Sequence, residues 1–169
     1  MEWRERVETE RLALRPLGHG DVDLYRRLRV RAESAARELE QAVEHWAAHG
    51  FGPWAILERG SEDAIGVLEV HFAGPGIGGI EPDEVEIGWS VAPERRGDGV
   101  ATEAARAALD DVFARARPPH VVAYVRPENA ASLRIAAKLG MRDDGEGTTR
   151  SGDRMRVFRL PRPTTIEAA

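Results

Sequence analysis

Six segments of the chain either alternate hydrophobic and polar residues with a period of two or form short apolar runs, and these patterns predict β-strands. They are RLALRPL (11–17), PWAILER (53–59), AIGVLEVHF (64–72), EVEIGWSV (84–91), HVVAYV (120–125) and RMRVFRL (154–160). The second and third segments are separated by only four residues, 60–63, so we expect them to form an antiparallel hairpin.

Apolar residues at helical spacing predict four helices in the remaining segments. These are residues 21–33, residues 34–50, the segment from a glycine-rich loop to about Ala116, and residues 129–141. In the first helix Asp21 is a candidate cap, and the apolar positions are Val22, Tyr25, Leu28 and Val30. Gly50 and Gly140 are placed to end the second and fourth helices.

The order of these elements predicts the fold class. A hairpin meander followed by strand, helix, strand, helix and strand indicates an α/β (α+β) fold, in which a mixed sheet carries helices on both faces. The chain of 169 residues is 42% hydrophobic and 31% charged, which suffices for one well-buried core. We expect a single domain over residues 1–161. Residues 162–169 combine proline with small polar side chains, and we expect them to form a disordered tail.

Composition excludes several classes of function. The net charge of -5 argues against a general nucleic-acid or anionic-membrane binder, because phosphate affinity comes from clustered positive charge. The chain has no cysteine, and its five scattered histidines lack the spacing of metal ligands, so we expect no disulfide and no metal site. No apolar run approaches the roughly 20 residues that span a bilayer, and the first residues lack the apolar core of a signal peptide. We therefore expect a cytoplasmic protein.

The segment RRGDGVATEA, residues 95–104, joins a predicted strand to a predicted helix. Gly97 and Gly99 can adopt backbone conformations that other residues avoid, and they let a ligand approach the main chain closely. The start of the following helix offers unpaired N–H groups and the positive end of a dipole, which together favour an anion such as a diphosphate. A strand-to-helix turn that needs glycine only for tight packing explains GxG equally well.

Three other motifs that share these residues do not fit. A dinucleotide fingerprint needs a third glycine, and a P-loop needs a lysine before Ser or Thr, whereas the only lysine here is Lys138. Arg96-Gly97-Asp98 spells an integrin-recognition tripeptide, which we treat as a chance match in a chain without cysteine or a secretion signal.

Two longer segments carry a family resemblance. EIGWSVAPERRGDGVATEA, followed by VRPENAASLRIAAKLGM, resembles the GCN5-related N-acetyltransferase (GNAT) superfamily. The family's loop pattern Gln/Arg-x-x-Gly-x-Gly/Ala falls on Arg96, Gly99 and Ala101. Its Asn-x-x-Ser/Ala helix, which ends in Gly-Phe/Met, falls on Asn129 and Ser132 and ends at residues 140–141. The opening TERLALRPL is similar to the branch of RimJ/RimL-type ribosomal-protein N-terminal acetyltransferases, and the resemblance covers roughly residues 9 to 160.

The resemblance implies a fold and a cofactor site. The fold is a mixed, mostly antiparallel central sheet with a splayed strand pair and helices on both faces. The cosubstrate is acetyl-CoA, whose diphosphate lies on main-chain N–H groups of the loop while the pantetheine runs along the preceding strand like an added strand. The cofactor-binding residues that it implies are Trp89, Val91, Arg96, Gly97, Asp98, Gly99, Val100, Ala101, Thr102, Asn129 and Ser132.

Glu86 and Ser132 are the candidate catalytic residues. Strand alternation places Glu86 on the face opposite Trp89, and similar glutamates act as bases in parts of the family; an exposed structural acid is the alternative. Ser132 is a candidate proton donor to the CoA thiolate or a contact on the thiol side, and the alternative is a helix start capped by Asn129. Many members use a tyrosine where this chain has Ala136. His71 is a weaker candidate for a second base, with a structural role as the alternative.

These residues predict an acetyl-CoA-dependent N-acetyltransferase. The acceptor is a primary amine, on a protein N-terminus or a small molecule, which attacks the thioester directly in a ternary complex, since no cysteine can carry the acetyl group. Acidic Glu40, Glu44, Glu84 and Glu86 favour a cationic amine. The alternatives are a non-catalytic acyl-CoA-binding or sensing module and a structural domain with an empty glycine turn. Dimerisation is common in the family, and the aromatic side chains at 46, 51 and 54 cover either a partner surface or the core.

Overall fold

The computed structural model describes residues 6–28 and 33–164. The strands are β1 (Val7–Glu8), β2 (Leu12–Pro16), β3 (Trp54–Glu58), β4 (Ala64–Phe72), β5 (Val85–Val91), β6 (His120–Val125), β7 (Arg142–Thr148) and β8 (Arg154–Pro161). The α-helices are α1 (Val22–Leu28), α2 (Ala35–His49), α3 (Val100–Arg115) and α4 (Ala130–Lys138), and the short 3₁₀ helices are η1 (His19–Asp21) and η2 (Pro93–Arg95).

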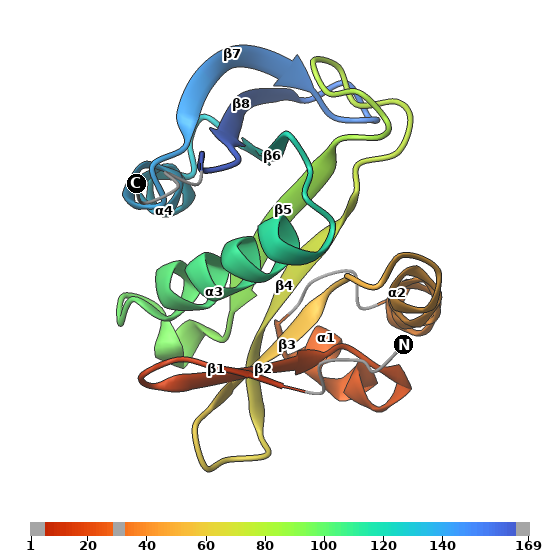
Figure 1. The fold of residues 1–169 in the computed structure, drawn as a ribbon, viewed down its shortest axis with the longest axis vertical. Helices are drawn as coiled ribbons and strands as arrows, with labels where there is room; N and C mark the ends of the chain where they lie inside the picture. Colours follow the sequence, from red (N-terminus) through yellow and green to blue (C-terminus); the bar gives the residue numbers. More distant parts are fainter. Residues whose placement is uncertain (1–5, 29–32, 165–169) are drawn as a thin grey trace, which may run out of the picture.

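The eight strands form one sheet in the order β1-β2-β3-β4-β5-β6-β8-β7. Every neighbouring pair is antiparallel except β5 and β6, which run parallel. Figure 1 shows β6, β8, β7 and α4 at one end of the molecule and β1 to β3 at the other, with β4 and β5 between them. The predicted mixed sheet and the predicted hairpin of β3 and β4 are confirmed.

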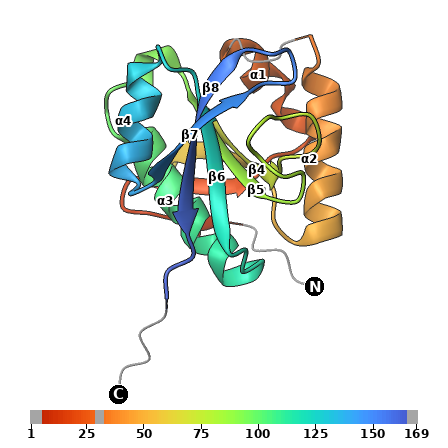
Figure 2. The same ribbon diagram turned by 90° about the horizontal axis from the view of Figure 1, so that it is seen from above.

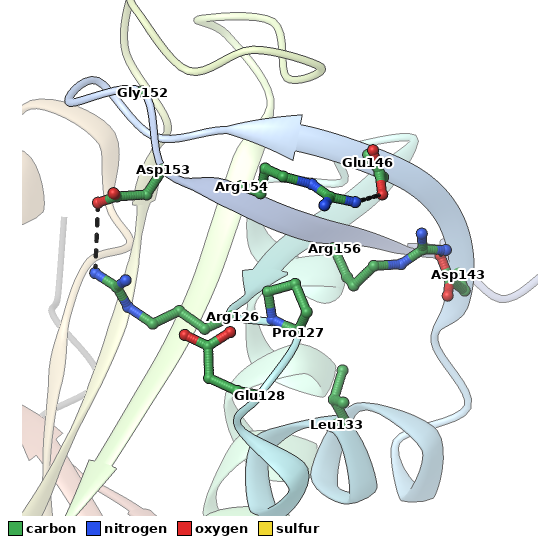
Figure 3. Close-up of a pocket in the computed structure, with 10 residues that line it drawn as sticks. All are labelled: Arg126, Pro127, Glu128, Leu133, Asp143, Glu146, Gly152, Asp153, Arg154 and Arg156. Atoms are coloured by element: carbon green, nitrogen blue, oxygen red, sulfur yellow. Dashed lines mark hydrogen bonds and ion pairs between the residues drawn. The ribbon is translucent and has the colours of Figure 1, made fainter.

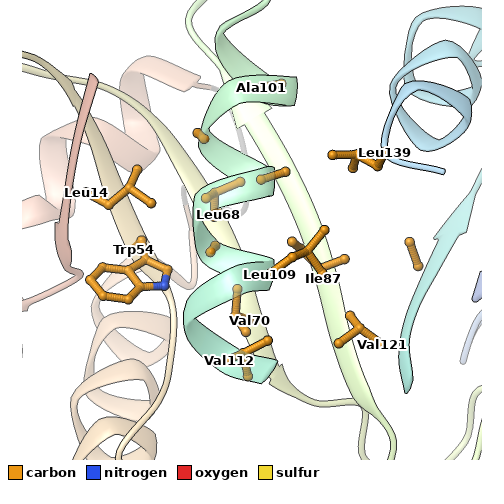
Figure 4. Packing of buried hydrophobic residues seen from close by; sticks show 14 of the residues in the cluster. Leu14, Trp54, Leu68, Val70, Ile87, Ala101, Leu109, Val112, Val121 and Leu139 are labelled. Atoms are coloured by element: carbon orange, nitrogen blue, oxygen red, sulfur yellow. The ribbon is translucent and has the colours of Figure 1, made fainter. Parts of the chain in front are cut away.

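Helices cover both faces of the sheet, as predicted (Figure 2). On one face, α3 packs in the middle of a cluster that includes residues of β2 to β6, with Leu109 and Val112 beside strand residues such as Val70 (Figure 4). Ala104 and Ala108 of α3 are fully buried, and their small side chains let the helix lie close to the sheet. On the opposite face, side chains of α1 and α2 pack against β3 and β4 in a second cluster.

The parallel strands β5 and β6 separate soon after they begin. They pair only through Val85 with Val121 and through Glu86 with Val122, although β5 continues to Val91. The side of β5 that faces β6 therefore lacks a strand partner over residues 87–91. The predicted splayed strand pair is confirmed. Pro93 then begins η2 and directs the chain away from the sheet.

An ion-pair cluster lies where the paired part of these strands begins. Arg159 of β8 donates to both carboxylate oxygens of Glu84, at 2.7 and 3.0 Å, and His120 and the Glu81 main-chain N–H also contact this carboxylate. Burial acts to raise the pKa of Glu84, but the hydrogen bonds from Arg159, Glu81 and His120 outweigh it and lower the pKa to about 2. The expectation that Glu84 favours a cationic substrate is wrong, because its carboxylate is already neutralised inside the fold.

Other local predictions need correction. Asp21 does not cap α1: it belongs to η1, accepts from the Gly18 N–H at 2.9 Å and forms an ion pair with Arg15. The aromatic side chains at 46, 51 and 54 are buried in the core, which confirms the core role that was one of their two predicted roles. Strands β1 and β7 were not predicted. The predicted end of the first helix, residues 29–32, and most of the predicted tail, residues 165–169, lie outside the described residues.

Candidate active site

The loop between β5 and α3 adopts the conformation that its glycines predict. Gly97 has φ 82° and Gly99 has φ 78°, both in the left-handed region that non-glycine residues avoid. A Cβ atom at Gly97 would meet nothing within 4 Å, so glycine is required there for the backbone conformation and not for space. A Cβ at Gly99 would lie 3.3 Å from Nη2 of Arg11. Residues 96–99 of this loop are exposed to solvent.

Helix α3 begins with unpaired main-chain donors beside this loop. Its first intrahelical hydrogen bond runs from the Glu103 N–H to the Gly99 carbonyl at 3.0 Å. The N–H groups of Val100, Ala101 and Thr102 therefore have no intrahelical acceptor. The N-cap residue is Gly99, which has no side chain that could cap them. The helix dipole adds positive potential at the same place. The arrangement suits an anion.

The turn before β2 fixes the orientation of the loop. Glu103 accepts hydrogen bonds from the Thr9 hydroxyl at 2.7 Å and from the Arg11 main-chain N–H and Nε at 3.0 and 2.7 Å. Burial acts to raise the pKa of Glu103, but these contacts outweigh it and lower the pKa. Arg11 Nη1 also donates to the Asp98 carbonyl at 2.9 Å. The Arg11 side chain thus contacts both the first turn of α3 and the glycine loop.

A cavity of about 390 Å³ lies between the glycine loop, the end of β5 and α4. Every predicted cofactor-binding residue except Asp98 lines it. The Asp98 side chain is instead exposed, with its carboxylate 3.6 Å from Arg95 Nε. The lining residues that were not predicted as binders are Ser90, Arg95, Ala131, Arg134, Ile135 and Lys138.

The cavity is electropositive. Four of its described lining residues are cationic, namely Arg95, Arg96, Arg134 and Lys138, and none is acidic. Arg95 is held by ion pairs with Glu58 and Asp98. Residues 131, 134, 135 and 138 recur at the spacing of one helix face, so the helical pattern after Asn129 could have revealed these additional lining residues. A site with this charge favours an anionic ligand.

The start of α4 places Ser132 in the cavity. The Asn129 side chain accepts from the Ser132 main-chain N–H at 3.1 Å, so the predicted N-cap is confirmed. The Trp89 indole N–H donates to the Ser132 hydroxyl oxygen at 3.2 Å. Ala136, one turn further along, is fully buried in the core. The side chain at the position of the family's tyrosine therefore offers no proton donor, and Ser132 is the hydroxyl that lines the cavity on this helix.

Glu86 lies on the face of β5 opposite Trp89. It is 7% exposed and does not line the cavity, although it is the last residue of β5 that pairs with β6. His71 is its direct partner on β4, so the two side chains share a face. Glu69 is on the same face and accepts from the Tyr25 hydroxyl at 2.9 Å. Glu86 thus stands at the point where the strands part, while Glu40 and Glu44 are exposed on α2.

A second, larger cavity of about 820 Å³ lies between α4 and the β7–β8 hairpin (Figure 3). Leu133 lines this cavity, whereas its neighbour Ser132 lines the first, so α4 separates the two. Its arginines are paired with acids: Arg156 with Asp143, Arg154 with Glu146 and Arg126 with Asp153. Glu128 adds a fourth acid beside the three arginines, so the second cavity lacks the excess positive charge of the first.

Within residues 6–28 and 33–164, no group of three or more His, Cys, Asp or Glu side chains is arranged to hold a metal ion. Over the same part of the chain, no helix has both the length and the apolar character needed to cross a membrane.

Comparison with known proteins identifies relatives in both sequence and structure. The family model of the acetyltransferase (GNAT) domain matches residues 11–142. YkkB of Bacillus subtilis (strain 168) is 36% identical over 92 residues, which are 50% of this chain and 54% of YkkB. The match thus spans about half the length of that curated relative.

Solved structures of other proteins share the fold. A Bordetella pertussis protein assigned to the GnaT family of acetyltransferases superposes with a TM-score of 0.81 at 26% identity, over 92% of this chain and 99% of that one. RimJ of Mycobacterium smegmatis, solved in complex with CoA-disulfide, superposes with a TM-score of 0.66 at 23% identity, over 89% of this chain and 81% of RimJ.

Proposed function

The chain belongs to the GNAT family of acetyltransferases, and on that premise we propose that it transfers the acetyl group of acetyl-CoA to a primary amine. The proposal treats residues 1–161 as one acetyltransferase domain. The observation that carries it is the 390 Å³ cavity, which combines exposed main-chain donors of a glycine loop with cationic side chains and no acidic one among its described lining residues. RimJ of M. smegmatis, which has the same fold, was solved with a CoA derivative bound, and this supports CoA as the ligand class.

The parts of the cavity match the parts of acetyl-CoA. The diphosphate binds the N–H groups of the glycine loop and the first turn of α3, and Arg134 and Lys138 add positive charge. The pantetheine amides hydrogen-bond to β5 beyond Glu86, where β6 no longer pairs with it. Each such hydrogen bond contributes a net ~1 kcal/mol, so affinity requires several of them together. The thioester then lies near Trp89 and Ser132, at the cavity end next to the split between the strands.

The reaction uses residues from both sides of the sheet. Glu86, directly or through water, takes a proton from the acceptor ammonium, whose ordinary pKa is near 10. The neutral nitrogen attacks the thioester carbonyl, and a main-chain N–H near Trp89 stabilises the resulting oxyanion. The nitrogen then loses its second proton to solvent, the C–S bond breaks with its electron pair going to sulfur, and Ser132 supplies the proton that makes the free thiol. The acceptor is a primary amine of a small molecule or of a protein N-terminus.

Calorimetric titration with acetyl-CoA tests the first step of this proposal. We expect saturable binding by the parent and binding at least tenfold weaker for Gly99→Glu, which puts bulk and negative charge into the diphosphate cradle. Gly60→Glu is the matched control, because Gly60 has a similar φ of 81° in an exposed turn where a Cβ meets nothing within 4 Å. The control carries the same backbone strain without touching the cavity, so we expect it to bind like the parent.

Three results distinguish the candidate functions. Diphosphate-dependent binding followed by thiol release with amines or peptide N-termini supports the acetyltransferase. Binding without thiol release from any amine identifies a non-catalytic acyl-CoA-binding module instead. No binding up to millimolar acetyl-CoA, or equal binding of an analogue without the diphosphate, overturns the proposal and leaves the glycine loop as a packing turn.

A further inference from the structure

The contact between Trp89 and Ser132 joins the splayed strand β5 to the start of α4. The apolar body of Trp89 packs against the main core cluster, and its indole edge reaches the cavity. There Nε1 lies 3.2 Å from Oγ of Ser132. In the described part of the chain, this indole is the only hydrogen-bond partner of the Ser132 hydroxyl.

The chemistry of the two groups determines which one donates. An indole N–H is a donor and cannot accept, whereas a serine hydroxyl does both. The Ser132 oxygen therefore accepts the bond, and its own proton must point elsewhere. The usual acceptors for a serine early in a helix are carbonyls three or four residues back. Within the described residues, the Ser132 hydroxyl makes no hydrogen bond to the carbonyls of Glu128 or Asn129, each of which accepts a main-chain N–H at 3.0 Å.

We propose that Trp89 is a positioning residue that aims the Ser132 hydroxyl proton at the sulfur of acetyl-CoA. This inference rests on the proposed function and goes beyond it by assigning a role to the indole N–H. Two bonds hold the serine: the indole fixes its oxygen, and Asn129 fixes its main-chain N–H at 3.1 Å. The remaining direction for the proton is the cavity that both side chains line.

The indole also makes Ser132 a stronger acid in the step that releases CoA. As the C–S bond breaks and the sulfur gains its electron pair, the Ser132 proton moves to sulfur and negative charge develops on the serine oxygen. A donor already aimed at that oxygen stabilises the developing charge without reorganisation. The positive end of the nine-residue helix α4 acts in the same sense. The acceptor ammonium gives up two protons, one to Glu86 before attack and one to solvent as the tetrahedral intermediate collapses. Solvent returns one proton to Ser132, and Glu86 releases its proton to solvent, so one proton is set free in each turnover.

A double-mutant cycle tests the proposal with four proteins: the parent, Trp89→Phe, Ser132→Ala and the double variant. Phenylalanine keeps an aromatic ring but removes the N–H. Loss of one hydrogen bond of net ~1 kcal/mol predicts a kcat about fivefold lower for Trp89→Phe. In the Ser132→Ala background the same change should leave kcat unaltered, because the hydroxyl that the indole positions is gone. The dissociation constant of acetyl-CoA should stay within about twofold throughout.

Trp46→Phe is the matched control for the loss of an indole hydrogen bond. Trp46 donates to the Pro53 carbonyl at 2.7 Å and lies in the core, outside the cavity. We expect its removal to lower thermal stability while leaving kcat within about twofold of the parent. A fall in kcat that merely accompanies lost stability would appear in this control as well.

A second measurement follows the hydrogen bond itself and needs no turnover. The indole ¹⁵N–¹H resonance of Trp89, assigned by its absence in Trp89→Phe, should move in Ser132→Ala, while those of the other three tryptophans stay in place. An unmoved resonance shows that the bond is absent and overturns the proposal.

The kinetic outcomes separate this inference from the function on which it rests. Equal effects of Trp89→Phe in both backgrounds, or a raised dissociation constant with unchanged kcat, overturn the positioning role and leave the acetyltransferase intact. A parent that fails to bind acetyl-CoA overturns both.

Discussion

Replacing Glu84 with glutamine removes the charge at the centre of the cluster that joins β5, β6 and β8. In the parent, this carboxylate accepts a bidentate pair of hydrogen bonds from Arg159, and the Glu84 side chain is only 10% exposed. The variant leaves the guanidinium with Asp144 at 3.4 Å and with the Gly79 carbonyl at 2.8 Å. We expect Glu84→Gln to destabilise the fold at the place where the splayed strands are still paired.

The size of the effect follows from the titration of Glu84. Its pKa falls from 4.5 to about 2 in the folded protein, which corresponds to at most about 3 kcal/mol. Because part of the cluster is in contact with solvent, screening reduces this stabilisation. We therefore expect Glu84→Gln to lower the free energy of unfolding by about 2 kcal/mol at pH 7. A depressed carboxyl pKa stabilises the folded state above the unfolded pKa and loses its effect as the pH falls through the folded value. The contribution of Glu84 should therefore be complete above about pH 4.5 and disappear towards pH 2.

Urea unfolding followed by tryptophan fluorescence, repeated from pH 7 down to pH 3, measures this contribution as the difference between parent and variant. Glu62→Gln is the matched control, since it breaks the Arg6–Glu62 ion pair, whose glutamate is 82% exposed. An exposed pair should contribute less than about 1 kcal/mol. A difference for Glu84→Gln as small as that of the control, or one that stays constant below pH 4.5, would refute the reasoning.

Two further predictions concern the two sides of the site. Glu86→Gln should slow acetyl transfer by about 100-fold at pH 7 and by less at pH 10, where the amine loses its proton without help. If the ratio of the parent rate to the variant rate did not change with pH, that result would contradict the role of Glu86 as a base. Arg11→Gln should raise the dissociation constant of acetyl-CoA severalfold, because it removes the side-chain hydrogen bonds from Arg11 to the Asp98 carbonyl and to the Glu103 carboxylate. An unchanged affinity in calorimetry would show that the glycine loop keeps its conformation without Arg11.

Much of the fold follows from the sequence because its signals are local. Alternation or a short apolar run marks each of β2 to β6 and β8 as a strand with one or two buried faces, and helical spacing marks α2, α3 and α4. The strand β7 is different: its sequence RDDGEGT has two glycines and no apolar residue, and most of it is exposed. It forms a strand because β8 supplies its hydrogen-bond partners and the Gly78–Thr148 bridge anchors its end. No local pattern encodes that partner.

In the site, too, some features depend on neighbouring residues and others on residues far away in the chain. The glycine conformations at 97 and 99 and the Asn129 cap depend on neighbours in the chain, and the sequence alone predicted them. The sequence did not predict that the Asp98 side chain is exposed beside Arg95, nor that Arg11, 87 residues distant, holds the Asp98 carbonyl. Nor did it predict that Glu84 is neutralised, because its partner Arg159 is 75 residues away.

The sequence by itself thus determined the family motifs, the order of most strands and helices and the presence of a glycine loop before α3, because backbone dihedral angles and the side on which a residue is buried depend on short-range spacing. Only the tertiary structure decided which charges are already paired, that α4 separates two cavities, and that the indole of Trp89 meets the hydroxyl of Ser132 across 43 residues of chain. Those contacts arise when distant segments pack around a common core, and no spacing in the linear chain specifies them.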